Sequence, residues 1–129
     1  MANSQRYTRE IPRRYRLEAQ KFECGCVSLA NRYICPDKSC KHSEKITLSG
    51  KGKILSYTVV HIAADDFAKE SPFPVAIIET EEGARLTAQV VDCDEKDLKI
   101  GADVQLVFRK IMEEGASGII KYAYKAILV

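Results

Sequence analysis

The chain of 129 residues has the length of one domain with room for a small appended module. An apolar fraction of 46% and a near balance of charge, net +2 from 29% charged residues, exclude an intrinsically disordered chain. The N-terminus lacks an apolar run and later apolar runs are short, so we expect no signal peptide, no membrane span and a cytoplasmic protein.

Residues 1–16 form a basic N-terminal helical arm with one acid, Glu10, and the bases Arg6, Arg9, Arg13, Arg14 and Arg16. Tyr7, Ile11 and Tyr15 recur every four residues, which is the spacing of one face of a short helix, interrupted or started at Pro12. Such a helix is marginal alone in water and orders against a neighbour. Two interpretations stay open: a solvated basic arm, or a docking arm that also meets phosphate groups.

Residues 17–43 hold four of the five cysteines as two close pairs, Cys24 with Cys26 and Cys35 with Cys40. In a reducing compartment such pairs point to metal before disulfide, and Gly25 permits a tight turn within the first pair. Four thiolates on two turns can surround a structural zinc ion, and so small a module needs such a staple. We therefore predict a zinc ribbon whose ligands are these four cysteines.

The spacing of the pairs, C-x-C and then C-x4-C, departs from the C-x2-C pairs that zinc ribbons usually show. Three alternatives therefore stay open. His42 replaces one of the cysteines, the metal is iron in a rubredoxin-like site, or the knot has lost its metal.

The sequence of residues 44–129 predicts a small β barrel. Runs rich in β-branched and aromatic residues predict strands over 53–61, 75–80, 85–91, 104–109 and 119–126. A further strand is expected over 15–19, one helical turn over 92–97, and turns over 81–84 and 113–118. Gly50 and Gly52 suggest a bulge or a sharp bend at the start of the first barrel strand.

A five-stranded Greek-key barrel of this size is the OB-fold, although the strand count alone also allows another small barrel. The predicted fold class is thus mainly β: an N-terminal helix, a zinc ribbon, then a five-stranded OB-fold barrel.

The loop over 63–74 holds two prolines and two aromatic side chains, Phe67 and Phe73. Either these rings cap the end of the barrel, or they face a ligand or partner. Catalytic signatures such as Gly-x-Ser-x-Gly or a Walker A run do not occur in the sequence. His61 ends a strand without a carboxylate partner in view, and Cys93 stands alone, so both are interpreted as structural.

A ribbon joined to an OB-fold first suggests a protein that binds single-stranded nucleic acid. The arginines could contact phosphates and the aromatic side chains could stack on bases. From Glu44 to Val129, however, acids and bases roughly cancel, and the turns are acidic. The lack of a positive stripe along the barrel argues against nucleic acid.

The whole pattern resembles a known family. An arginine-rich helix, a four-cysteine ribbon and a barrel entered through the run SGKGKILSYTVVH over 49–61 resemble the acyl-CoA-associated OB-fold family with a rubredoxin-like zinc ribbon, formerly a domain of unknown function. The segments 72–76 and 99–101 strengthen the likeness. Cys24-Gly25 and Cys35-Pro36 match its two knuckles, while its earlier cysteine would fall at Lys21, so that Cys26 would substitute.

The resemblance implies a non-catalytic scaffold subunit, not an enzyme. Archaeal members look like bridges between acetoacetyl-CoA thiolase and HMG-CoA synthase at the head of the mevalonate pathway, where a shared coenzyme A site would let the intermediate pass between them. The alternative partner is another acyl-CoA thiolase or a hydratase. Residues expected to face CoA or acyl-CoA, or the partner, are Phe67, Lys69, Phe73, Arg13 and Arg14.

Overall fold

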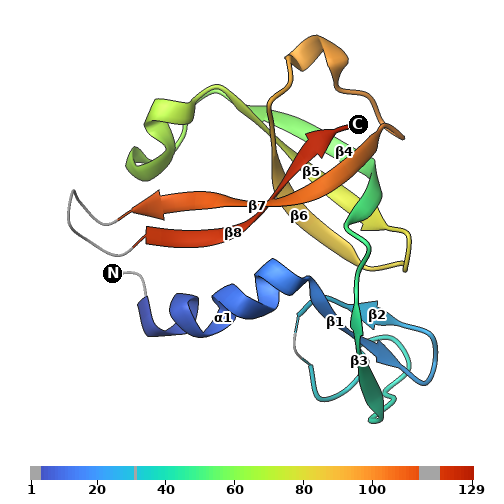
Figure 1. Ribbon diagram of the computed structural model, residues 1–129. Helices are drawn as coiled ribbons and strands as arrows, with labels where there is room; N and C mark the ends of the chain where they lie inside the picture. Colours follow the sequence, from blue (N-terminus) through green and yellow to red (C-terminus); the bar gives the residue numbers. More distant parts are fainter. Residues whose placement is uncertain (1–3, 31, 114–119) are drawn as a thin grey trace.

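The protein, seen as a computed structural model that describes residues 4–30, 32–113 and 120–129, has a helix, a small sheet and a barrel in chain order (Figure 1). The helix is α1 (Ser4–Arg16), and the small sheet contains β1 (Glu18–Phe22), β2 (Val27–Ser28) and β3 (Ser43–Thr47). The barrel strands are β4 (Lys51–Val60), β5 (Phe73–Thr80), β6 (Arg85–Val91), β7 (Asp103–Glu113) and β8 (Ile120–Leu128). Two 3-10 turns complete it, η1 (Asp65–Glu70) and η2 (Glu95–Asp97). The predicted fold class is confirmed.

Helix α1 lies along the long β7–β8 hairpin, where Figure 1 shows it running beneath both strands. Tyr15 meets Phe108 of β7 edge to face at 5.2 Å between ring centroids, and Phe108 stacks on Tyr122 of β8 at 5.5 Å. The helix thus orders against its own barrel. Pro12 lies inside it without ending it, so the predicted interruption is wrong. The strand predicted over 15–19 exists but begins later, at Glu18, because residues up to Arg16 belong to the helix.

The small sheet has the strand order β2-β1-β3, with Glu18 opposite Thr47 and Phe22 opposite Ser43. Strand β3 therefore belongs by its pairing to the ribbon, although it follows the division at residue 43 that the sequence suggested. That division into arm, ribbon and barrel stays a prediction.

The barrel closes in the order β4-β5-β6-β8-β7, with β6 and β8 parallel and the other neighbours antiparallel. Its core is apolar and comes from every strand and from the loop after η2. The buried members are Ile54, Ala76, Ile78, Leu86, Ala88, Val90, Leu98, Val104, Leu106 and Ala126.

The irregular points of the barrel differ in part from the prediction. The bulge lies between Ile54 and Ser56 of β4 and not at the glycines. Gly50 instead turns the chain into β4 with a φ of +84°, and Gly52 lets the β5 backbone approach. The predicted turn over 92–97 is confirmed by η2, whereas η1 lies in a stretch predicted as a plain loop. The predicted turn over 113–118 falls almost entirely outside the described residues.

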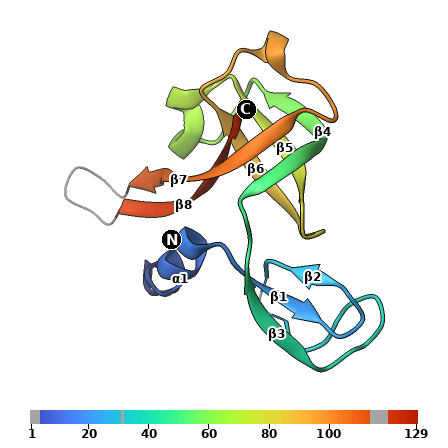
Figure 2. The same ribbon diagram turned by 45° about the vertical axis from the view of Figure 1, so that its right-hand side comes forward.

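The ribbon is tied to the barrel at the turn between β5 and β6 (Figure 2). The backbone N–H of Ser49 donates to Glu82 Oε1 at 2.8 Å, and the Ser49 hydroxyl donates to Glu81 Oε2 at 3.1 Å. Beside these bonds Ala84, from the same turn, packs with Ala19 and Leu48 in a small buried cluster. The β5–β6 turn thus completes the hydrophobic core of the ribbon.

Candidate metal centre and partner-facing residues

Two backbone turns hold the cysteine pairs. In the first, Gly25 N–H donates to Phe22 O at 2.9 Å and Phe22 N–H donates to Cys26 O at 2.8 Å, while Gly25 itself has a φ of +89°. This confirms the tight turn predicted at Gly25. In the second, Cys35 N–H donates to Cys40 O at 2.9 Å and Ser39 N–H donates to Cys35 O at 3.0 Å.

The turns bring three thiols into one group. The sulfur atoms of Cys24, Cys26 and Cys35 all lie within 4.8 Å of one another, and those of Cys24 and Cys35 are 3.5 Å apart. A tetrahedral zinc ion with Zn–S bonds of about 2.3 Å spaces its sulfur ligands about 3.8 Å apart. The three thiols therefore fit a thiolate-bound metal ion in both chemistry and spacing.

The predicted fourth ligand, Cys40, is not a member of that compact group. Its sulfur lies 4.0 Å from Lys38 O, and its thiol is one of the groups that lower the pKa of Cys24. His42 is exposed, and its carbonyl accepts the Glu23 N–H at 3.2 Å; it does not join the group either. Of the two candidates for the fourth position, Cys40 is the one whose thiol influences the pKa of Cys24.

The cluster lowers one thiol pKa and raises two others. The Cys26 backbone N–H, then the Cys40 thiol, lower the pKa of Cys24 to about 7. Hydrogen bonding to Cys35, then burial, raises the pKa of Cys26 to about 12, with Asp37 Oδ2 at 3.5 Å adding to the effect. Bonding to Cys24 raises the pKa of Cys40. Cys24 is therefore the thiol of the group that loses its proton most readily, and a thiolate sulfur is a ligand that suits a soft cation.

Arg13 and Arg14 lie on the face of α1 that turns toward the ribbon and barrel. The Arg13 guanidinium donates to the carbonyl of Leu29 and pairs with Glu10 at 3.2 Å. Burial raises the pKa of Tyr124, while the positive charges of Arg14 and Arg13 oppose that rise. Both arginines are half-buried, so in the free chain Arg13 fastens α1 to the ribbon.

The predicted loop residues gather around η1. Phe67 and Phe73 meet at 6.3 Å between ring centroids, both half-buried, and Lys69 is exposed. The structure thus pairs the two rings, as expected of a cap on the barrel end, and leaves Lys69 to solvent. The hollows that Arg13 lines, one of them together with Arg14, are not lined by Phe67, Lys69 or Phe73.

Two lysines that the sequence reasoning missed are buried on β8. Lys121 is 1% exposed and Lys125 is 5% exposed. Lys125 Nζ lies 3.6 Å from Glu70 Oε1, and Gln89 donates to the other oxygen of Glu70 at 3.1 Å, so η1 is held over this face. Lys121, Ala123 and Lys125 share one face of β8 by their alternation, and all three are buried.

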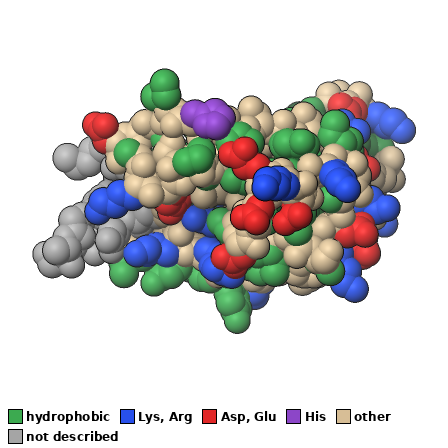
Figure 3. All heavy atoms as spheres, turned by 90° about the horizontal axis from the view of Figure 1, so that it is seen from above, with side chains coloured by type: hydrophobic (Ala, Val, Ile, Leu, Met, Phe, Trp, Pro, Cys, Tyr) green, Lys and Arg blue, Asp and Glu red, His purple; other side chains and the backbone are tan. Residues whose placement is uncertain are grey.

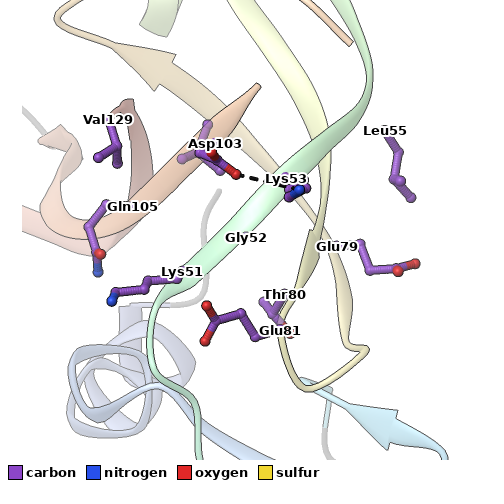
Figure 4. A pocket seen from close by; sticks show the side chains of 11 residues that line it. Lys51, Gly52, Lys53, Leu55, Glu79, Thr80, Glu81, Asp103, Gln105 and Val129 are labelled. Atoms are coloured by element: carbon purple, nitrogen blue, oxygen red, sulfur yellow. Dashed lines mark ion pairs between the residues drawn. The ribbon is translucent and has the colours of Figure 1, made fainter. Parts of the chain in front are cut away.

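A hollow of about 600 Å³ lies beside β4 and is lined by charges of both signs (Figure 4). Lys53 Nζ is 3.9 Å from Asp103 Oδ1 across it. A second hollow, of about 390 Å³, lies between α1, the segment after β2, and β6. The face seen in Figure 3 likewise mixes acidic and basic side chains without a continuous basic band. Cys93 is half-buried, and its pKa is raised by burial and the nearby Asp97.

No helix in the described ranges is both long and apolar enough to cross a membrane.

The comparisons with known proteins cover nearly the whole chain. Residues 45–109 match the family model described as ChsH2, C-terminal OB-fold domain. A DUF35 domain-containing scaffold protein of Methanothermobacter thermautotrophicus is 46% identical over 97% of this chain and 96% of its own length. A protein of the same description from Methanocaldococcus jannaschii is 49% identical over 91% of this chain and 84% of its own.

Among solved structures, one named Ltp2-ChsH2(DUF35) aldolase superposes with a TM-score of 0.68. It is 23% identical and covers 97% of this chain and 94% of the solved one. At that identity the likeness concerns the fold, and it extends through helix, ribbon and barrel alike.

Proposed function

Because this chain belongs to the family of DUF35 domain-containing scaffold proteins, we propose that it is a non-catalytic scaffold subunit of an acyl-CoA enzyme complex. One observation carries the proposal: 46% identity, along 97% of the chain, to a relative described as a scaffold protein. The name of the structural neighbour, which joins Ltp2 and ChsH2(DUF35), is in keeping with a protein that works beside another chain.

The finer proposal follows the family resemblance. The chain bridges acetoacetyl-CoA thiolase and HMG-CoA synthase and helps to form a shared CoA site, so that the thiolase product reaches the synthase without leaving the complex. Condensation of two acetyl-CoA molecules is unfavourable, and prompt removal of its product draws it forward. The alternative is the same scaffold role beside another acyl-CoA thiolase or a hydratase.

The architecture supports this role through its rigidity. The ribbon shares its core with the β5–β6 turn, and α1 is fixed both to β7 through Tyr15 and to the ribbon through Arg13. Parts that are fixed to one another can hold two partners at a constant spacing, which is what positioning of reacting groups requires. We place a structural zinc ion in the ribbon, with Cys24, Cys26, Cys35 and Cys40 as its ligands.

In the same proposal CoA or the partner enzyme meets two groups of residues. Phe67, Lys69 and Phe73 lie at η1, whose Lys69 ammonium is free to approach a phosphate. Arg13 and Arg14 line the hollow of about 390 Å³ between α1 and the barrel.

Co-expression tests the scaffold role directly. The chain is expressed together with the thiolase and the synthase of the same genome, and the mixture is separated by size exclusion with light scattering. We expect one species with a fixed ratio of the three chains. Separate elution of the three chains overturns the bridge, and recovery of a hydratase or another thiolase from native extract supports the alternative. Turnover of acyl-CoA by the isolated chain contradicts the non-catalytic part.

A further inference from the structure

Among the described residues, one side of β4 lacks a neighbouring strand over more than half of its length. Its first residues pair with β7, at Lys51, Gly52 and Lys53, and Ile54 exchanges backbone hydrogen bonds with Gly101 and Ala102 at 2.7 and 3.0 Å. From Leu55 to Val60 the strand pairs only with β5 within the described residues. Beyond Ile54 the strands β4 and β7 diverge, and β4 continues toward η1 (Figure 1).

Along this free edge, residues 55–60, the part of the chain that the structure describes gives the outward-facing backbone groups no partner. In an antiparallel ladder every second residue directs both its N–H and its C=O away from the strand it pairs with. Such a row of donors and acceptors is a template for another strand. Just beyond this region, the Ser71 hydroxyl donates to His61 O at 2.6 Å.

The side chains of the edge are uncharged. The sequence is Leu-Ser-Tyr-Thr-Val-Val, with Leu55 39% and Tyr57 38% exposed. Natural proteins protect exposed edges with lysine, proline or covering loops, and this edge has none of those residues. Strand β3, at the edge of the ribbon sheet, differs from this edge, because its sequence Ser-Glu-Lys-Ile-Thr carries two charged side chains.

Exposed isoleucines stand at both ends of the edge. Ile100, 72% exposed, precedes the Gly101 that bonds to Ile54, and Ile62, 93% exposed, follows β4 by two residues. Leu55 and Tyr57 stand two residues apart on β4, and the two isoleucines lie beyond its unpaired part at either end. Singly exposed apolar residues are ordinary, but exposed apolar side chains beside free backbone groups favour docking of an extended strand.

We propose that residues 55–60 receive an extended, uncharged segment of the partner enzyme, which adds to β4 as a further strand. The inference deepens the proposed scaffold role and rests on it for the source of that segment. A single strand is the occupant because six backbone residues and four apolar side chains offer far less surface than the roughly 800 Å² per partner of a stable globular interface. A second copy of this chain would need that larger area.

Hydrogen exchange measured by mass spectrometry tests the proposal on the isolated chain and on the complex with thiolase and synthase. We expect amides within 55–60 to exchange at least about tenfold more slowly in the complex, since edge pairing protects them. Amides of β3, the charged edge in the same chain, serve as the matched control and keep their rates.

A paired variant, Ser56→Lys with Thr58→Lys, puts charge on the edge at two exposed positions. We expect it to weaken the complex at least about tenfold while the thermal midpoint of the isolated chain is kept. Thr47→Lys, at an exposed position of β3, is the control and binds as the parent does.

The outcomes separate the two proposals. A complex that forms with unchanged exchange over 55–60 overturns the edge inference and leaves the scaffold role standing. Absence of any complex overturns both. If the isolated chain forms a dimer, and the variant Ser56→Lys with Thr58→Lys is a monomer, the edge binds a second copy of the chain. That result overturns the occupant proposed here.

Discussion

Substituting Gly52 by alanine is the sharpest test of how β4 crosses the barrel. A Cβ atom at this position would lie 2.7 Å from Glu79 O and 2.9 Å from Ile78 Cγ2. Both distances are shorter than carbon atoms tolerate, and the first involves the backbone of β5, which pairs with β4 on one side and β6 on the other. The strand cannot move aside without losing hydrogen bonds.

The size of the effect follows from two opposing contributions. Forcing an extra carbon into a packed site costs about 1–3 kcal/mol, and a rigid backbone neighbour places this site at the upper end. Replacing glycine restricts the unfolded chain and returns about 0.4–1 kcal/mol. We therefore expect Gly52→Ala to lower the free energy of unfolding by about 2 kcal/mol, and the thermal midpoint by roughly 5–10 °C.

Urea and thermal denaturation followed by circular dichroism measure both quantities. Gly83→Ala is the matched control, because Gly83 has a φ of +93° but nothing within 4 Å of an added Cβ. That variant carries backbone strain of about 1 kcal/mol without a clash. A Gly52→Ala protein within about 0.5 kcal/mol of the parent would refute the reasoning, since surface changes without a named cause fall in that range.

Two further predictions concern the ribbon and its joint to the barrel. We expect Cys24→Ser to purify with well under one zinc ion per chain and a lower thermal midpoint, because the variant lacks one thiol of the cluster. The control Cys93→Ser should keep its metal. Equal zinc contents of the two variants, measured by inductively coupled plasma emission spectroscopy, would count against the proposed site. Burial opposes ionisation of Glu82, but hydrogen bonds, first from the Ser49 N–H, outweigh it and hold the pKa of Glu82 below its usual value. The ionised Glu82 therefore stabilises the folded state above the unfolded pKa of about 4.3, and this stabilisation is lost as the pH falls through the lower folded pKa. The unfolding free energies of the parent and of Glu82→Gln, measured by urea denaturation from pH 7 downward, should therefore converge. A difference between them that stays constant with pH would contradict this.

Much of the fold could be read from local patterns. The cysteine pairs predicted the ribbon because close spacing on two turns needs no knowledge of distant contacts. The five barrel strands were found because β-branched and aromatic residues fill them, and η2 fell where 92–97 was expected to turn. The boundary between ribbon and barrel was harder to predict, because β3 joins the ribbon by pairing with β1. Nothing in the local sequence of residues 43–47 indicates that pairing.

Site details that depend on distant partners escaped prediction. Arg13 was expected to face CoA or a partner, or to belong to a solvated basic arm. Its guanidinium instead donates to the carbonyl of Leu29, a backbone group that every residue possesses and that no motif marks. The buried Lys125 owes its place to Glu70, far away in sequence. The free edge of β4 is likewise a matter of register, because the same strand pairs with β7 at Lys53 and not beyond Ile54.

The bonds of Ser49 to Glu81 and Glu82 have a mechanical consequence. They join the turn between β5 and β6 to Ser49, in the segment between β3 and β4, and so help to fix how the ribbon is oriented against the barrel. Substitutions in the cysteine turns would change the surface that the ribbon presents. Substitutions at Ser49, Glu81 or Glu82 would instead change where that surface lies relative to the barrel.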